Sequence, residues 1–145
     1  MIAIGSDHGG FDLKQDLMAY LDELGIAYED FGTKTKESCD FPDIAEPVCE
    51  VVASGAAELG ILVCGTGIGM SMAANKIKGI RAAVVSDAYS AHFTRLHNDC
   101  NVLCLGGRVV GPGLARMIVD EFLNTEFEGG RHQRRIDKIM ALEDR

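Results

Sequence analysis

The feature that most constrains the fold is a regular alternation of short apolar runs with longer stretches of helical periodicity. The apolar runs are MIAIGS, IAYEDF, LGILVC, RAAVVS and NVLCLGG, at residues 1–6, 26–31, 59–64, 81–86 and 101–107. Helical patterns follow them at 11–24, about 43–54, after Gly69 to about Lys76, about 88–97 and 112–123, and a last one spans about 131–142. Five successive β–α units predict an α/β fold. We expect a three-layer Rossmann-like fold: a five-stranded parallel sheet, helices on both faces and an extra C-terminal helix.

Local signals support these elements. In the first helix, apolar residues fall at positions 11, 13, 17, 18, 20, 21 and 24, which places them on one face, and Gly25 is suited to end it. LGILVC is apolar throughout, as a central strand covered on both sides should be. Pro112 stands where a first helical turn tolerates proline.

The composition is that of an ordinary globular chain, and we expect one domain over residues 1–145. The formal net charge of −8 argues against nucleic-acid and membrane partners, because both bind clustered positive charge. The start MIAIGSDHGG lacks the basic and apolar regions of a signal peptide, and no apolar run approaches a membrane span in length. A small anionic ligand remains compatible, since a few arginines can form a positive pocket.

The five cysteines occupy positions 39, 49, 64, 100 and 104 and form no C-x-x-C pair. An odd number without such pairs predicts reduced thiols and a cytoplasmic location. The same spacing argues against a zinc site.

The segment VCGTGIGMSMAANK, residues 63–76, is the strongest candidate for chemistry. Its glycines at 65, 67 and 69 separate a strand from a helix, where backbone N–H groups can approach an anion. The pattern is neither G-x-G-x-x-G nor a P-loop, and such a turn also serves plain strand-to-helix packing. Cys64 ends the strand beside these donors, where a thiolate is favoured. Its alternative role is that of a small buried apolar residue.

Three other polar residues are candidates. Asp7 and His8 follow the first strand, at the sheet edge where parallel sheets bind ligands, although helix capping and turn chemistry also explain them. His97 ends the fourth helix, where the helix dipole alone would favour it. His92, in the same helix, has only a structural interpretation.

The stretch GGRHQRR, residues 129–135, contains three arginines. Arg131 and Arg135 share a helix face, and two guanidinium groups on one face suit a phosphate monoester. The alternative is a solvated basic face paired with acidic neighbours. Arg108, after the double glycine that ends the fifth strand, is a further phosphate candidate.

Two other classes of function fit less well. A nucleotide-binding module needs G-x-G-x-x-G after the first strand, where this chain has SDHGG. A redox or acyl-transfer enzyme built on Cys64 needs a resolving cysteine nearby or a G-x-S-x-G elbow, and neither is present.

Taken in order, these segments resemble the sugar-phosphate isomerase family of ribose-5-phosphate isomerase B and the galactose-6-phosphate isomerase subunits, the former type most of all. The matching segments are GSDHGG (5–10), DFPDIA (40–45), CGTGIGMSMAANK (64–76), RA (81–82), HNDCNVLCLGGRVVG (97–111) and EGGRHQRRI (128–136). No single motif decides the matter, but the set in register is highly specific and runs nearly from end to end.

The resemblance implies an aldose–ketose isomerisation without metal or cofactor, which interconverts D-ribose 5-phosphate and D-ribulose 5-phosphate in the pentose phosphate pathway. A six-carbon sugar phosphate or a free rare aldose such as allose is the alternative substrate. The resemblance also implies a homodimer, or a dimer of dimers, with active sites shared between subunits.

Carried over by position, the resemblance assigns roles to individual residues. Cys64 would be the base that moves a proton between C2 and C1, and His97 would help to open the furanose ring, with Asp7 as its partner. The enediolate oxyanion would be held by Gly65, Thr66, Gly67, Ile68 and Gly69. The sugar would be bound by Asp7, His8 and Asn98, and the phosphate by Arg108, Arg131 and Arg135 with help from His8.

Two positions distinguish this chain within the family. A second form of the family uses a glutamate just past the glycine loop as base; here that position is Met70 and Cys64 is present, so the chain resembles the cysteine type. Many relatives carry a tyrosine where this chain has Phe41, which removes a hydroxyl contact to the sugar and bears on substrate preference.

The implied chemistry agrees with the features of the turn after Cys64. Removal of a proton alpha to a carbonyl needs both a base and donors for the oxyanion, and this turn would supply the donors and favour the thiolate.

Overall fold

One five-stranded sheet organises the computed structural model, which describes all residues, 1–145. The strands are β1 (Ile2–Ser6), β2 (Tyr28–Asp30), β3 (Leu59–Cys64), β4 (Ala82–Val84) and β5 (Val102–Gly106). All pair in parallel, in the order β2-β1-β3-β5-β4. The predicted α/β fold is confirmed, and β1, β3 and β5, the three interior strands, are the ones whose ends carry the glycine turns.

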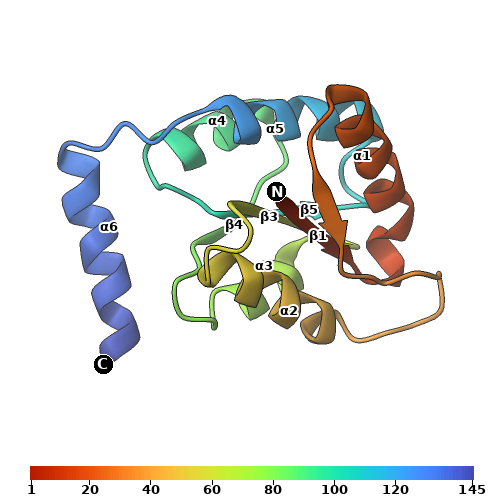
Figure 1. Cartoon of the computed structure of the whole chain (residues 1–145), viewed down its shortest axis with the longest axis horizontal. Coiled ribbons are helices and arrows are strands. Elements are labelled where there is room, and N and C mark those ends of the chain that lie inside the picture. Colours follow the sequence, from red (N-terminus) through yellow and green to blue (C-terminus); the bar gives the residue numbers. More distant parts are fainter.

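Helices cover both faces of the sheet (Figure 1). On one side lie α1 (Phe11–Leu24), α4 (Ala88–Leu96) and α5 (Pro112–Asn124), and on the other α2 (Phe41–Ala53) and α3 (Ile68–Ala74). Short 3₁₀ turns occupy His8–Gly10 and Leu142–Asp144. The three layers follow from strands whose two faces are both apolar.

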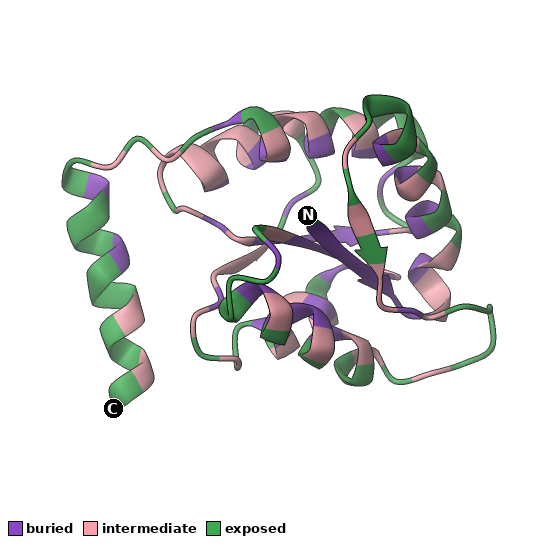
Figure 2. Cartoon of the chain, viewed as in Figure 1, coloured by how far each residue is buried: buried purple, intermediate pink, exposed green.

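The core divides into two clusters because successive residues of a strand point to opposite faces. In β3, Ile61 and Val63 pack toward α1 and α5, whereas Leu62 and Cys64 pack toward α2 and α3. Figure 2 shows that burial is continuous along the central strands and confined to one stripe on each surrounding helix. A fully buried side chain such as Phe122 contributes roughly 1.5–3 kcal/mol to folding by leaving water.

The observed elements differ from the predicted ones mainly at their ends. The strands expected at 26–31 and 81–86 shorten to three residues each, because β2 and β4 are the two edge strands and pair on one side only. The helix expected from about 43 begins at Phe41, since its first turn accommodates Pro42. The helix after the glycine loop begins at Ile68 and ends at Ala74, where Asn75 caps it.

The C-terminal helix α6 (Arg131–Ala141) stands apart from the three layers, at the side of β4 (Figure 1). The Glu143 carboxylate accepts a hydrogen bond from the Gly79 N–H at 2.9 Å, and Met140 contacts the guanidinium of Arg81. Gly79 and Arg81 precede β4, so α6 faces the amino ends of the strands. None of the helices combines the length and the apolar character needed to cross a bilayer.

Candidate active site

Cys64 lies at the carboxyl end of β3 and is 5% exposed. Its Sγ accepts a hydrogen bond from the Gly67 N–H at 3.0 Å. The first backbone hydrogen bond of α3 runs from the Ser71 N–H to the Gly67 carbonyl at 3.1 Å. The N–H groups of Gly69 and Met70, which precede Ser71, therefore have no partner within the chain. Negative charge on the sulfur, or on a ligand beside it, would therefore meet several oriented donors.

Two positions of the glycine loop leave no room for a side chain. Gly67 has φ of +80°, and a Cβ placed on it would lie 2.8 Å from the carbonyl carbon of Leu105. At Gly69 a Cβ would lie 2.7 Å from Cζ of the Phe41 ring. Glycine is thus required both for the left-handed backbone and for the close approach of its neighbours. The ring of Phe41 packs directly on the loop.

Arg108 is the cationic residue of this part of the molecule. The turn after β5 is tied to the glycine loop by the Gly107 N–H, which donates to the Cys64 carbonyl at 2.8 Å, and by the Arg108 N–H, which donates to the Gly65 carbonyl at 3.0 Å. Nη1 of Arg108 would lie 3.3 Å from a Cβ on Gly65, so the guanidinium lies over the loop. No carboxylate approaches it within 4.0 Å, and its charge is available to an anion.

Asp7 and His8 lie in the neighbouring turn after β1. The Asp7 N–H donates to the Val63 carbonyl at 3.1 Å, which fixes the turn against β3. The Asp7 carboxylate accepts from the Gly10 N–H at 3.1 Å, so the capping role expected as an alternative is present. His8 accepts at Nδ1 from the Cys39 N–H at 3.2 Å, so its other ring nitrogen, Nε2, is left for a ligand.

The remaining predicted residues lie at the other end of the sheet. His97 and Asn98 precede β5, whereas Arg108 follows it, and a strand of five residues separates the two ends by roughly 15 Å. Asn98 lines a cavity of about 650 Å³ between the amino ends of β4 and β5 and the C-terminal helix α6, which carries Arg131 and Arg135. One chain therefore brings the predicted residues together as two separate half-sites.

The model of the Ribose/Galactose Isomerase family matches residues 2–139. The chain belongs to this family. Ribose-5-phosphate isomerase B of Escherichia coli is 53% identical over 144 residues, which cover 99% of this chain and 97% of that protein. The structure of the Clostridium thermocellum enzyme of the same name has a TM-score of 0.97 at 52% identity, over 99% of this chain and 97% of that one. The Mycoplasma genitalium enzyme with bound ribulose-5-phosphate has a TM-score of 0.94 at 45% identity, over 99% and 95%.

In this member of the ribose/galactose isomerase family, Asp99 holds the turn that presents His97 and Asn98. Its backbone has φ of 47°, and its carboxylate pairs with Arg95 Nη1 at 3.1 Å and Arg81 Nη2 at 3.3 Å. None of these three residues was given a role from the sequence. The motif HND offered a signal, because an aspartate tolerates the left-handed backbone that a tight turn needs.

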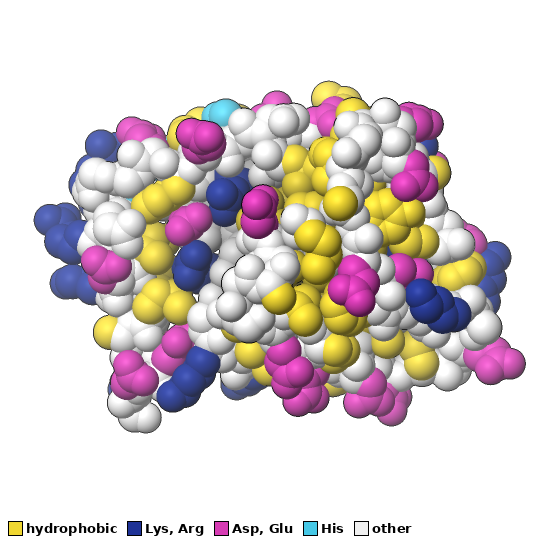
Figure 3. Space-filling model, viewed as in Figure 1, with side chains coloured by type: hydrophobic (Ala, Val, Ile, Leu, Met, Phe, Trp, Pro, Cys, Tyr) yellow, Lys and Arg dark blue, Asp and Glu magenta, His cyan; other side chains and the backbone are white.

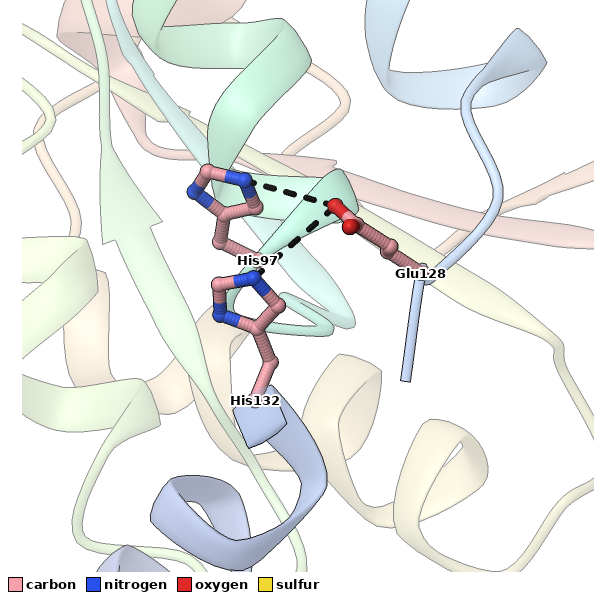
Figure 4. A group of neighbouring side chains, drawn as sticks. All are labelled: His97, Glu128 and His132. Atoms are coloured by element: carbon pink, nitrogen blue, oxygen red, sulfur yellow. Dashed lines mark ion pairs between the residues drawn. The ribbon is translucent and has the colours of Figure 1, made fainter. Parts of the chain in front are cut away.

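Glu128 and His132 are the other residues near the site that sequence reasoning missed (Figure 4). Oε2 of Glu128 lies 3.5 Å from Nε2 of His97 and 3.8 Å from Nε2 of His132. The two imidazole rings stack with centroids 4.1 Å apart. Burial, followed by the nearby His97 and Arg131, lowers the pKa of His132. Both residues fall in the segment EGGRHQRRI, which was the available signal.

The arginines of α6 have no acidic partners. Neither Arg131 nor Arg135 has a carboxylate within 4.0 Å, so the pairing with acidic neighbours that the sequence allowed is not found. Figure 3 shows basic side chains gathered on the part of α6 that faces away from the rest of the isomerase. Their charges are thus open to a ligand or to another molecule.

Several other polar candidates have structural roles. Burial raises the pKa of the Cys49 thiol to about 12 and also raises those of Cys100 and Cys104, which suits protonated core residues. Asp87, in the turn between β4 and α4, caps α4 by accepting from the Ser90 N–H at 2.6 Å. In this isomerase chain, Cys64 is the buried cysteine whose sulfur meets the glycine loop.

Proposed function

We propose that the protein is a ribose-5-phosphate isomerase of the B type, which interconverts D-ribose 5-phosphate and D-ribulose 5-phosphate. The hydrogen bond from the Gly67 N–H to Cys64 Sγ, inside a loop of unpartnered N–H groups, is the observation that carries the mechanism. Relatives named ribose-5-phosphate isomerase B match the chain over nearly its whole length, and one of them binds ribulose-5-phosphate.

In this proposal the Cys64 thiolate removes the proton from C2 of the open-chain aldose. The C2–H electron pair forms the C1–C2 double bond of the enediolate, and the carbonyl pair moves to O1. The N–H groups of the glycine loop stabilise the negative oxygen in place of water. The Cys64 thiol then returns the proton to C1, while the hydroxyl proton of O2 is transferred to O1, which gives the ketose.

The ring must open before this step, because D-ribose 5-phosphate is mainly a furanose. His97 and Asp7 are assigned to ring opening, and His8 and Asn98 to binding of the sugar hydroxyls. The phosphate is assigned to Arg108, Arg131 and Arg135. Phosphate binding far from C1 and C2 supplies energy that positions the reacting carbons.

We further propose that a homodimer assembles complete sites from the two half-sites. The half with Cys64, Asp7, His8 and Arg108 lies at the carboxyl ends of the strands, and the half with His97, Asn98 and α6 lies at the amino ends. Exposed apolar side chains adjoin the Cys64 half: Ile68 is 50%, Val84 41% and Val109 60% exposed. Such surface is suited to contact with a second copy.

The proposed chemistry requires neither metal nor cofactor, because Cys64 supplies the base and the loop supplies the positive dipoles. Reduced cysteines are needed for it, and all five thiols are free. Free thiols are typical of the cytoplasm, which is the proposed location.

The direct test is an assay of ribulose 5-phosphate formation from D-ribose 5-phosphate in the presence of EDTA, with Cys64→Ala in parallel. Turnover by the native protein and its loss in the variant would support the substrate and the base together. Turnover by both would assign the base elsewhere, and no turnover by the native protein would overturn the proposed substrate.

Phe41 favours a second candidate, an isomerase of six-carbon sugar phosphates or of free aldoses such as allose. Cζ of its ring, the atom that bears the hydroxyl in tyrosine, lies against the glycine loop at Gly69. The ring therefore offers the sugar an apolar surface where a tyrosine would offer a donor. Comparison of kcat/KM for ribose 5-phosphate, allose 6-phosphate and allose, in the native protein and Phe41→Tyr, separates the two candidates.

A further inference from the structure

Three ligand-type side chains converge beside the half-site of His97. One ring nitrogen of His97, one ring nitrogen of His132 and a carboxylate oxygen of Glu128 all lie within 4.8 Å of one another. Figure 4 shows both imidazoles directing a nitrogen toward the same carboxylate, with His97 coming from the end of α4 and His132 from the start of α6. The Glu128 N–H donates to the Leu96 carbonyl at 2.9 Å, which fixes Glu128 between them.

The distances do not suit hydrogen bonds. The Glu128 oxygen is 3.5 Å from His97 Nε2 and 3.8 Å from His132 Nε2, whereas good N–H···O bonds lie at about 2.7–3.2 Å. Two ligand atoms bound to one tetrahedral zinc ion, each at about 2.0–2.2 Å, are roughly 3.3–3.5 Å apart. The two distances from the carboxylate to the imidazole nitrogens are therefore close to those between ligands of a shared cation.

His132 adds independent evidence. Its side chain is 8% exposed, and its Nε2 has no hydrogen-bond partner although it is buried. A buried polar atom without a partner costs about 1–3 kcal/mol, so its retention calls for an explanation. A cation coordinated by this nitrogen would satisfy it.

We propose that His97, Glu128 and His132 form an inhibitory site for a divalent cation of the zinc type. Two imidazoles and one carboxylate match the ligand preference of Zn²⁺, and a fourth position stays open to water. The inhibition, unlike the binding, rests on the proposed function, in which His97 opens the sugar ring. A zinc ion on Nε2 of His97 occupies the lone pair that the imidazole needs for proton transfer.

Binding requires small movements that the site permits. The rings are stacked at 12°, so the more exposed ring of His97 must tilt about its Cβ–Cγ bond for the lone pairs to converge. The side chains of His97 and Glu128 are 35% and 49% exposed and can adjust, whereas His132 is held in place by burial. The charge of nearby Arg131 opposes a cation, which suits reversible binding.

The first test is calorimetric titration of chelator-treated protein with ZnCl₂. We expect one Zn²⁺ per chain, with affinity lowered at least about tenfold in Glu128→Gln and in His132→Gln, since each removes one of three ligands. Asp137→Asn is the matched control. Asp137 is an exposed carboxylate in α6, the helix of His132, and it accepts a hydrogen bond from Gln133 rather than facing the two histidines. Equal affinity in all four proteins would overturn the site.

Cobalt distinguishes this site from binding to a thiol. Co²⁺ bound by two imidazoles and a carboxylate gives visible ligand-field bands without the near-ultraviolet charge-transfer band of a cobalt–thiolate bond. A thiolate band that persists in Glu128→Gln and vanishes in Cys64→Ser or Cys39→Ser would assign the metal to a cysteine and overturn the proposal.

The third experiment measures the rate of conversion of ribose 5-phosphate at increasing concentrations of ZnCl₂. We expect inhibition of the native protein, reversal by EDTA, and at least about tenfold weaker inhibition in Glu128→Gln. Binding as described without inhibition would overturn the inhibitory role. A protein that binds Zn²⁺ in the expected way but never isomerises ribose 5-phosphate would instead overturn the proposed function, so the two failures are distinguishable.

Discussion

The Sγ atom of Cys64 and the backbone N–H of Gly67 are joined by a hydrogen bond of 3.0 Å. This bond links the proposed base directly to the loop that would hold the oxyanion. Because the donor belongs to a left-handed glycine, the position of the sulfur depends on a backbone conformation that other residues rarely adopt. The base and the donors are thus positioned by the same turn.

Replacement of Cys64 should abolish proton transfer while leaving the fold intact. We expect Cys64→Ala to lower kcat/KM for ribose 5-phosphate by at least about 10²–10⁴-fold, the usual contribution of a positioned acid–base group. Cys49→Ala is the matched control, because the pKa of that buried thiol is raised to about 12 and it faces the core. Steady-state kinetics measure kcat/KM of both variants, and circular dichroism checks that both are folded. An unchanged kcat/KM in Cys64→Ala would refute the assignment of Cys64 as the base.

Gly67→Ala should damage the site through the backbone. The added methyl group would lie 2.8 Å from the Leu105 carbonyl carbon at a φ of +80°, so the loop must shift and the bond to Cys64 must lengthen. We expect a fall in kcat greater than any rise in KM, together with a lower Tm. Gly113→Ala, where nothing lies within 4 Å of the new Cβ, should keep full activity and gain about 0.4–1 kcal/mol of stability. Equal kcat in the two variants would show that the loop geometry is not needed.

The sequence predicted the fold class and the half-site around Cys64 because both depend on local patterns. Apolar runs alternating with helices define the sheet, and the strand ends place Asp7, Cys64 and Arg108 at one edge. The lengths of β2 and β4 were overestimated, since each pairs on one side only and leaves the sheet while its neighbour, β1 or β5, continues to Ser6 or Gly106. The sequence does not reveal which strands are at the edge.

The cluster around His97 could not be predicted, because it joins segments far apart in the chain. His97 and His132 are brought into a stack by the path of residues 125–130, which no periodicity describes. Asp99 likewise acquires its two arginine partners from α4 and from the turn before β4. Short sequence motifs draw attention to these residues, but they do not reveal the long-range contacts that give the residues a role.

The arginines of α6 should act through binding rather than chemistry. We expect Arg131→Ala and Arg135→Ala each to raise KM for ribose 5-phosphate about tenfold or more with a smaller change in kcat, since charge-assisted hydrogen bonds are worth about 1.5–3 kcal/mol. Arg134→Ala is the control, because it removes one positive charge from the same helix at a residue to which no contact with phosphate is assigned. If all three variants raise KM equally, net charge rather than a phosphate site is responsible.

The cap of α4 should give stability that depends on pH. The hydrogen bond from the Ser90 N–H, together with that from its hydroxyl, lowers the pKa of Asp87. The folded protein thus binds this proton more weakly than the unfolded chain, so the stabilisation is present above about pH 4 and is lost as the pH falls through the folded pKa. Asp87→Ala should lower Tm at neutral pH, and the gap to the native protein should narrow in acid. Asp87→Asn is the control, because asparagine caps a helix but does not titrate, so the difference in Tm between Asp87→Asn and Asp87→Ala should not change with pH. If the difference in Tm between the native protein and Asp87→Ala also stays constant with pH, the cap does not act through the charge of Asp87.

Complementation between two inactive variants should reveal whether subunits share sites. In a hybrid dimer of Cys64→Ala and His97→Asn, a shared arrangement gives one site with both defects and one site with neither. Equal amounts of the two chains, co-refolded, should therefore recover about a quarter of native activity, because half of the dimers are hybrids with one intact site. Mixing Cys64→Ala with Gly67→Ala is the control, since both defects lie in the same half-site and no intact site can arise. If native mass spectrometry shows hybrids but the first mixture stays inactive, each chain must build its site alone, and the separation of His97 from Cys64 at opposite ends of the sheet would then exclude His97 from the chemistry.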